Sequence, residues 1–401
     1  MKILQDIRVL DLSRVISGPF CSRMLGDLGA EIIKIESPRG DQLRNTIPMK
    51  GQFSASFTQF NAGKKSLCID YRTERGVELV KQLAGKCDVF LENFRAGLLA
   101  ETGLGYDEIK AVKPDIVYCS ISGFGQAGPN AGRPAYTDII HALSGFDYAA
   151  QKMFGNETDS PPGYPASLGD TCASLNATIS ILAALYHRAV SGQGQYIDVS
   201  MLDSLIASND STLQRTIFSD GELDEPSIIF RPPLRLKDGY IAASVALNFE
   251  KVVMAMDLPE LIIDERFKTA MLQRENMMEY ISIVAEWAHD KTVEQVSAIF
   301  DEYDIPYGKV NSSQEVVDSQ IVSDREMKVD LTLPGGVLTS VINTPFNFSS
   351  GKSRPQGPPP LLGEHNDVVL RDLLGLSDDA RQSLVDEGII DSHTGESRSE
   401  V

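Results

Sequence analysis

Short apolar runs alternate with helical segments through the N-terminal half of the chain, and no other feature restricts its fold as strongly. Helices are predicted between the runs, for example over residues 74–84. Such alternation is typical of an α/β fold with a largely parallel sheet. Ligands of these sheets bind beyond the carboxyl ends of the strands, so we expect the functional residues there. The runs that we interpret as strands are residues 7–12, 31–36, 66–71, 89–91, 115–122 and 196–199.

The composition changes near residues 219–233, where prolines and polar residues indicate a linker. Residues 234–245 then predict a hairpin with Asp238-Gly239 as its turn. Helical patterns follow at 248–256, 276–290, 292–302 and 313–318. We therefore predict four parts: a first part of a large α/β domain (1–224), a smaller α+β domain (225–328), an extended return with a helix over 366–376 that completes the large domain (329–390), and a polar tail (391–401).

The charge balance limits the possible partners. The net charge is −19, which argues against nucleic acids and against anionic membrane surfaces as partners. The five cysteines form no CxxC pair and their number is odd, which indicates a reducing compartment. No signal peptide and no run of 18 apolar residues is found, so we predict a cytoplasmic protein without a membrane span.

Asp170 stands at the start of a predicted helix, directly after Gly169. Leu175, Ile179, Leu182 and Tyr186 recur at helical spacing, and we expect this face of the helix to be buried. An aspartate there can be an N-cap, typically worth ~1 kcal/mol. It can also be a nucleophile, because the helix N-terminus favours the ionised carboxylate. The local pattern alone favours the cap.

Residues 123–128 spell GxGxxG after a predicted strand. A dinucleotide fingerprint requires a helix that opens inside the motif. Pro129 and Pro134 follow here, so a regular helix cannot form and a nicotinamide cofactor is disfavoured. We interpret the motif as a glycine loop near Asp170.

The stretch LGDTCASLNATISILAALYHRAVSGQGQYIDVSM resembles the corresponding part of the family III CoA-transferases (CaiB/BaiF type). The similarity covers about residues 6–218 and returns near 360–376. It implies that Asp170 is the nucleophile. It also implies a large Rossmann-like domain built from both chain ends, an inserted small domain, and an interlocked homodimer. No metal and no redox cofactor is implied, and the histidines of this chain show no metal-ligand spacing.

The resemblance also implies a set of contacts to coenzyme A, most of them just after predicted strands. Tyr136 and Met201 are expected to border the thioester. For an isolated Arg39 or Arg72, a solvated surface position is the commoner role of arginine. The residues implied in coenzyme A binding are Val15, Ile16, Ser17, Arg39, Arg72, Asn93, Phe94, Arg95, Gly125, Tyr136 and Met201.

Three departures from the family pattern bear on substrate specificity. Ile16 replaces a glutamine, Thr102 replaces a basic residue, and no glycine-rich loop is found near 250–262. These differences argue against formate or oxalate as substrates. The racemase branch needs a histidine near position 136, where this chain has Tyr136; His141, one turn on, fits a helix histidine better.

We therefore predict transfer of coenzyme A from an acyl-CoA to a small carboxylic acid through aspartyl-anhydride and aspartyl-CoA intermediates. The alternatives are an acyl-CoA racemase or isomerase with Asp170 as acid/base, and a silent coenzyme A-binding protein. Arg231 and Arg235 flank two prolines and could clamp a dicarboxylic acceptor. A plain surface role is the commoner one for such arginines.

Overall fold

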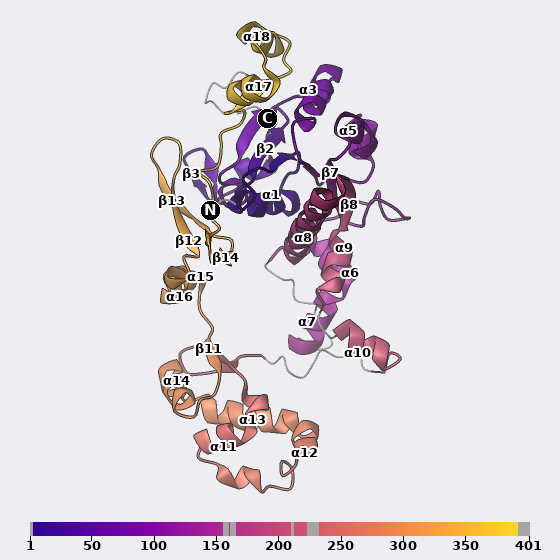
Figure 1. The fold of residues 1–401 in the computed structure, drawn as a ribbon. Helices are drawn as coiled ribbons and strands as arrows, with labels where there is room; N and C mark the ends of the chain where they lie inside the picture. The colour runs from indigo at the N-terminus through magenta and orange to yellow at the C-terminus, as the bar shows by residue number, and fades with distance from the viewer. Residues whose placement is uncertain (1–2, 155–159, 161–165, 210–211, 223–231, 392–401) are drawn as a thin grey trace. The chain divides into compact units, whose positions relative to one another are not determined.

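The computed structural model describes residues 3–154, 160, 166–209, 212–222 and 232–391. The chain divides into two compact units (Figure 1). The first comprises Met1–Asp147, Gly163–Asn209 and Ile321–Val401, and the second comprises Tyr148–Pro162 and Asp210–Gln320. Arg231 and the tail residues 392–401 lie outside the described residues.

The first unit contains a six-stranded parallel sheet with the order β5-β2-β1-β6-β7-β8. This is the doubly wound arrangement, in which the strand order reverses between β1 and β6. The predicted α/β fold with a parallel sheet is confirmed. The strands are β1 (Arg8–Asp11), β2 (Glu31–Glu36), β5 (Lys65–Cys68), β6 (Val89–Glu92), β7 (Val117–Ser122) and β8 (Gln195–Ser200).

Different helices cover the two faces of this sheet, because successive strand residues point to opposite sides. Leu10 belongs to the core cluster that includes residues of α3, α4, α5, α17 and α18, whereas Val9 belongs to the cluster that includes residues of α1, α6, α8 and α9. The helices are α1 (Ser17–Asp27), α3 (Glu74–Ala84), α4 (Leu98–Glu101), α5 (Tyr106–Val112), α6 (Thr137–Ser144), α8 (Leu168–Ser191), α9 (Met201–Ala207), α17 (Asn366–Leu374) and α18 (Asp378–Asp386).

Helix α8 buries a different face from the one predicted. Ala173, Ala177 and Ile181 are fully buried, whereas Ile179 is 64% and Tyr186 is 75% exposed. The prediction was wrong because small residues let a helix approach its neighbours closely, and α8 packs with this small-residue face against α1, α9 and β8. By length and composition α8 could also cross a membrane, but 44% of its most apolar window is buried inside the protein.

The return through residues 329–362 is less extended than predicted. β12 and β13 form a hairpin around Gly335 and Gly336, both with positive φ. Ile342 of this hairpin exchanges two hydrogen bonds with the Gln59 amide of α2. The further elements of this unit are η1 (Gln42–Asn45), β3 (Met49–Lys50), β4 (Phe53–Ser54), α2 (Ala55–Asn61), β12 (Lys328–Thr332), β13 (Leu338–Ile342), β14 (Asn347–Phe348) and β15 (Gly351–Lys352), with α16 (Gln320–Asp324) at the boundary.

The second unit has its own core around Phe249, Phe267 and Tyr280. The predicted hairpin is present: β9 and β10 pair antiparallel, and β11 extends the sheet. Its elements are α10 (Thr212–Phe218), β9 (Leu234–Arg235), β10 (Tyr240–Ala243), η2 (Val245–Leu247), α11 (Phe249–Ala255), η3 (Pro259–Ile262), α12 (Ala270–Glu275), α13 (Met277–Ala288), α14 (Val293–Glu302), β11 (Tyr307–Lys309) and α15 (Ser313–Val317), with α7 (Phe146–Phe154) at the boundary.

Candidate active site

The loops after β1 and β6 meet where the strand order of the sheet reverses. The Asn93 side chain accepts a hydrogen bond from Arg14 N at 2.9 Å and donates one to Arg14 O at 2.7 Å. It also donates to Ser17 Oγ at 3.0 Å. One asparagine after β6 thus fixes the loop between β1 and α1. This is the position at which doubly wound sheets bind their ligands.

The first turn of α1 lies very close to that loop because residue 18 has no side chain. A Cβ on Gly18 would lie 2.1 Å from Ser13 Cβ and 3.5 Å from Asn93 Cγ. No other residue fits without moving the loop or the helix. Gly18 therefore keeps the loop, the helix start and Asn93 together.

Asp170 lies in the first turn of α8, two residues after Leu168, the first residue of the helix. The N-cap position belongs to Ser167, so the interpretation of Asp170 as the cap is wrong. The first turn of α8 can lie this close to α6 because residue 169 is a glycine: a Cβ on Gly169 would lie 3.1 Å from Ile140 Cγ2 of α6. The Asp170 carboxylate is thus brought beside the first residues of both α6 and α1.

Groups at these two helix starts stabilise the Asp170 carboxylate. Thr137 Oγ1 donates a short hydrogen bond to Oδ2. Ser17 interacts through both its hydroxyl and its backbone N–H. Ser174 Oγ links the partners further, since it donates to Ser17 O and to Asp170 O, each at 2.7 Å.

Burial raises the pKa of Asp170 above its usual value, while the donors Thr137 and Ser17 oppose the rise. A carboxylate in such a place is poorly solvated but still held by hydrogen bonds that favour its charge. Poor solvation makes it a stronger nucleophile than a carboxylate in water. The site therefore supplies a half-buried, oriented carboxylate at the N-terminus of a long helix.

The Thr137→Val variant tests the role of this hydrogen bond. The bond favours the ionised form of Asp170, so its loss is expected to raise the pKa of the carboxyl further. If the reaction needs ionised Asp170, activity is lost as the pH falls through this pKa, which lies above the ordinary 3.8. The acid limb of the kcat/KM profile should therefore move to higher pH in Thr137→Val. The matched control is Thr102→Val, which removes a hydroxyl at the C-cap of α4. An acid limb that does not move in Thr137→Val would contradict a requirement for ionised Asp170.

The glycine loop after β7 is held by the next strand. Gln126 N donates to Asp198 Oδ2 of β8 at 2.8 Å. Gly125 has a φ of +82°, and a Cβ there would lie 3.4 Å from the same oxygen. Helix α6 begins only at Thr137, so no helix opens inside the GxGxxG motif, as predicted from the prolines. The loop leads instead to Thr137 and so to Asp170.

The predicted coenzyme A residues fall into two groups. The loop residues Val15, Ile16 and Ser17 lie beside Asn93, and buried Met201 places its Cε near Gly169. The others are more dispersed: Phe94 is buried with the Arg14 guanidinium 5.0 Å from its ring centre, and Tyr136 is 67% exposed. The exposed arginines are Arg39, Arg95 and Arg72, of which Arg72 forms a two-pronged ion pair with Asp70.

Sequence reasoning missed several residues that shape the site. Thr137 follows the predicted Tyr136 directly, and Arg14 directly precedes the predicted Val15, so each lies next to a residue that was predicted. Glu92 was also missed: its buried carboxylate accepts from Phe94 N at 2.7 Å and fixes the turn after β6. Burial raises the pKa of Glu92 to about 7. Within the described part of the chain, no group of three metal-binding side chains is found.

Comparisons with known proteins identify the family of this chain. The model for CoA-transferase family III matches residues 4–366. The succinyl-CoA:glutarate CoA-transferase of Mus musculus is 34% identical over an alignment of 402 residues, which covers 98% of this chain and 91% of that protein. The succinyl-CoA–D-citramalate CoA-transferase of Chloroflexus aurantiacus is 32% identical and covers 94% of this chain and 95% of its own.

A solved structure gives the same result. The crystal structure of a CaiB/BaiF family protein from Brucella suis superposes with a TM-score of 0.80 at 30% identity. The match covers 92% of this chain and 99% of that one. The family resemblance seen in the sequence is thereby confirmed. The chain belongs to CoA-transferase family III, whose members transfer coenzyme A from an acyl-CoA to a carboxylic acid.

Proposed function

We propose that Asp170 carries the transferred group covalently. The observation that carries this proposal is the position of its carboxylate: half-buried, in the first turn of α8, hydrogen-bonded by Thr137 and stabilised in its charged form by Ser17. A structural aspartate in a helix needs no such arrangement, because an exposed first-turn position already stabilises its charge. A covalent relay conserves the energy of the thioester bond, which hydrolysis would lose.

The reaction proceeds in four substitutions. The Asp170 carboxylate attacks the donor thioester carbonyl, and coenzyme A leaves as thiolate, which gives a mixed anhydride. The thiolate attacks the aspartyl carbonyl, so the donor acid leaves as carboxylate and an aspartyl-CoA thioester remains. The acceptor carboxylate attacks this thioester and expels the thiolate. The thiolate then attacks the acceptor carbonyl of the new anhydride, which forms the acyl-CoA product and restores Asp170. Each step passes through an oxyanion that backbone N–H groups can stabilise, and the loop with Gly125 is our candidate.

The substrates we propose are succinyl-CoA as donor and a short dicarboxylic acid as acceptor. Several relatives are named for such pairs: succinyl-CoA with glutarate, D-citramalate or mesaconate. A site for a second carboxylate needs a cation. Arg235 on β9 is exposed and remains a candidate, whereas Arg231 lies outside the described residues.

The test is transfer of labelled coenzyme A. The protein is incubated with succinyl-CoA labelled in the coenzyme A part and with glutarate, mesaconate, citramalate, acetate or octanoate. We expect label in the thioesters of the dicarboxylic acids and little in those of the monocarboxylic acids. Preference for octanoate would contradict the proposed acceptor class. Uptake of solvent deuterium at the α-carbon of the acyl-CoA, without transfer, would instead indicate a racemase. Binding of acyl-CoA without either reaction would indicate a silent coenzyme A-binding protein.

We further propose that Arg72 contacts a phosphate of coenzyme A. Its Nε and Nη2 bind Asp70 at 2.7 Å, which orients the guanidinium and leaves Nη1 for another acceptor. The Arg72→Ala variant is expected to raise the KM for acyl-CoA about tenfold with little change in kcat, because the phosphates are remote from the reacting carbon. Arg75→Ala, a neighbouring exposed arginine, serves as the control. A normal KM with a collapsed kcat would contradict the proposed contact.

We also propose that the protein is a cytoplasmic homodimer. Helix α8 exposes an apolar stripe of Leu175, Ile179, Tyr186 and Val190 on the face opposite its buried alanines. Contiguous apolar surface of this kind commonly marks an interface. Sedimentation velocity on the wild type and on Ile179→Glu tests this: we expect a dimer whose association weakens in the variant. A monomeric wild type would contradict it.

A further inference from the structure

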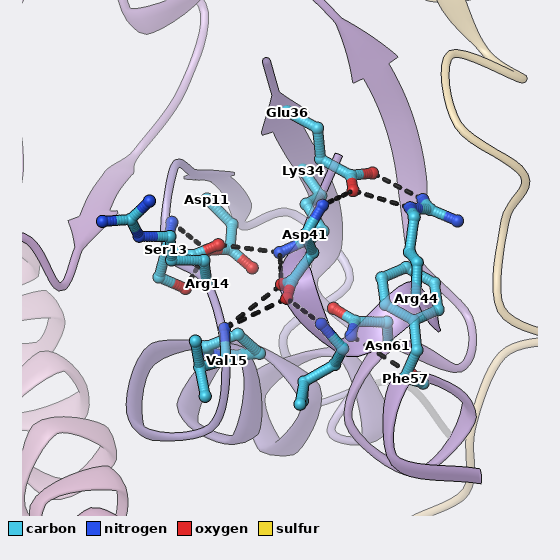
Figure 2. Close-up of polar contacts among 12 residues, drawn as sticks. Asp11, Ser13, Arg14, Val15, Lys34, Glu36, Asp41, Arg44, Phe57 and Asn61 are labelled. Atoms are coloured by element: carbon cyan, nitrogen blue, oxygen red, sulfur yellow. Dashed lines mark hydrogen bonds and ion pairs between the residues drawn. The ribbon is translucent and has the colours of Figure 1, made fainter. Parts of the chain in front are cut away.

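A buried ion pair lies against the loop that carries Val15 and Ser17. Lys34 of β2 and Asp41 form this pair at 3.0 Å, and both side chains have an exposed fraction of 0%. Lys34 Nζ also donates to Ser13 O at 2.7 Å, and Val15 N donates to both Asp41 oxygens at 3.2 and 3.3 Å. Figure 2 shows Val15 linked to Asp41 in this way. The pair therefore holds the backbone on both sides of Arg14.

Val15 has a backbone conformation that its side chain opposes. Its φ of +67° lies in the left-handed region, which β-branched residues rarely adopt. Such a conformation persists only where surrounding contacts impose it, and it concentrates at functional sites. The contacts here are the Asp41 carboxylate on Val15 and the Asn93 amide on Arg14. Asp41 is therefore the group that opposes relaxation of this backbone.

The strained residue lies two positions before Ser17, which Ser174 links to Asp170: Ser174 Oγ donates to Ser17 O and to Asp170 O, each at 2.7 Å. Ser17 also stabilises the charge of the Asp170 carboxylate. A relaxed Val15 would redirect the chain into Ile16 and Ser17. It would thereby move Ser17 relative to Asp170, together with the loop that we expect to contact coenzyme A. Errors of about 1 Å in the position of reacting groups can cost about 10²-fold in rate.

We propose that Lys34 and Asp41 are positioning residues for the transfer reaction: they hold Val15 in its left-handed conformation and so align Ser17 with Asp170. The proposal rests on the proposed role of Asp170. Asp41 is suited to this task because its own position is fixed by other elements. Its backbone N donates to Glu36 Oε2 at 3.1 Å, and its Oδ1 accepts from Leu43 N at 3.0 Å. Neither Lys34 nor Asp41 touches the Asp170 carboxylate in the contacts of the described residues.

The first variant is Asp41→Asn, which keeps the volume but offers one acceptor oxygen to the three donors Lys34 Nζ, Val15 N and Leu43 N. We expect kcat/KM to fall about 10- to 100-fold. The matched control is Asp27→Asn. It breaks another buried pair, Arg23–Asp27 at 2.7 Å with both side chains 1% exposed, at the far end of α1. Loss of stability alone would affect both variants, so an equal loss of activity in Asp27→Asn would overturn the proposal.

The decisive measurement combines Asp41→Asn with Val15→Gly. Glycine adopts a positive φ without strain, so it no longer needs the carboxylate to hold it. The loss caused by Asp41→Asn should therefore be at least about fivefold smaller in the Val15→Gly background than in the wild type. Equal losses in the two backgrounds would overturn the proposal. If Asp41→Asn does not fold, Asp41→Glu replaces it in the same cycle, since it keeps the charge but displaces the carboxylate.

A second readout separates this proposal from the proposed function. The Kd for free coenzyme A is measured by calorimetry on all four proteins of the cycle, and the Asp170→Ala variant is assayed in parallel. Full turnover in Asp170→Ala would refute the covalent role of Asp170, while the cycle in Kd would still report whether Asp41 acts through Val15. Full turnover in Asp41→Asn, with Asp170→Ala inactive, would refute only the positioning role.

Discussion

Replacing Asp170 by alanine is expected to abolish transfer while leaving coenzyme A binding nearly intact. The carboxylate forms both covalent intermediates in the proposed reaction, and no other group bound to it, neither Thr137 nor Ser17, can replace it as a nucleophile. The barrier should rise by at least ~4 kcal/mol, about 10³-fold in kcat. Steady-state kinetics and calorimetric titration with coenzyme A measure the two expected effects. Retention of more than about a tenth of the wild-type turnover rules out Asp170 as nucleophile.

The control for this variant is Asp107→Ala. Asp107 is also an acidic residue in the first turn of a helix, α5, but it is exposed and remote in sequence from the site. The Asp107→Ala variant should keep full activity, because it removes only the stabilisation that any carboxylate gains in the first turn of a helix. Mass spectrometry after treatment with acyl-CoA and hydroxylamine locates the adduct directly. A modification on any residue other than Asp170 would contradict the mechanism even if the alanine variant were inactive.

The sequence predicted the sheet and the edge of it that carries the site, because both follow from local patterns. Apolar runs separated by helices give a parallel sheet, and the carboxyl ends of its strands lie together. Val15, Ile16, Ser17 and Asn93 could therefore be placed near one another before the structure was known. The contact between Thr137 and Asp170 could not, because it depends on how closely α6 approaches α8 at Gly169.

The buried face of α8 shows why periodicity alone is insufficient. The helix carries two apolar stripes, one of large residues such as Ile179 and one of small residues such as Ala177. Hydrophobicity favours burial of the large stripe, whereas close packing against α1 and β8 requires the small one. Within a single chain the stripe of small residues is the buried one. The large stripe is then left for another partner, which the proposed homodimer supplies.

The buried charges were not predictable for a different reason. Lys34, Asp41 and Lys64 are of residue types that usually lie on the surface. In the structure Lys34 pairs with Asp41, and Lys64 pairs with Asp11, which is far from it in the sequence. Charged residues are rarely fully buried unless they are paired, so a single sequence favours exposure for each of them. Only the three-dimensional structure shows that Asp11, Lys34 and Asp41 lie together behind the loop after β1 (Figure 2). Lys64 joins this group through its ion pair with Asp11.

Removing Asp11 from this group is expected to cause a large loss of stability. Its carboxylate accepts hydrogen bonds from Ser13 N at 2.9 Å, Ser22 Oγ at 2.6 Å and Lys64 Nζ at 3.0 Å. The side chains of Asp11 and Lys64 are 0% and 1% exposed, so Asp11→Ala leaves a buried ammonium without its counterion. Breaking a buried pair in this way costs ~3–5 kcal/mol. Urea unfolding at pH 7 measures the loss.

The control and the pH dependence distinguish this charge effect from a general effect of mutation. Glu31→Ala also removes a carboxylate with two cationic partners, Arg8 and Lys65, but its side chain is 28% exposed, so the cost should stay below ~1 kcal/mol. Burial alone would raise the pKa of Asp11, but Lys64 and Lys34 lower it from 3.8 to about 2. A lowered pKa gives stability that is present above 3.8 and is lost as the pH falls toward 2. The difference in unfolding free energy between wild type and Asp11→Ala should therefore become smaller as the pH falls from 3.8 to about 2. A difference that stays constant from pH 7 to pH 2 would show that packing, and not the charge, accounts for the loss.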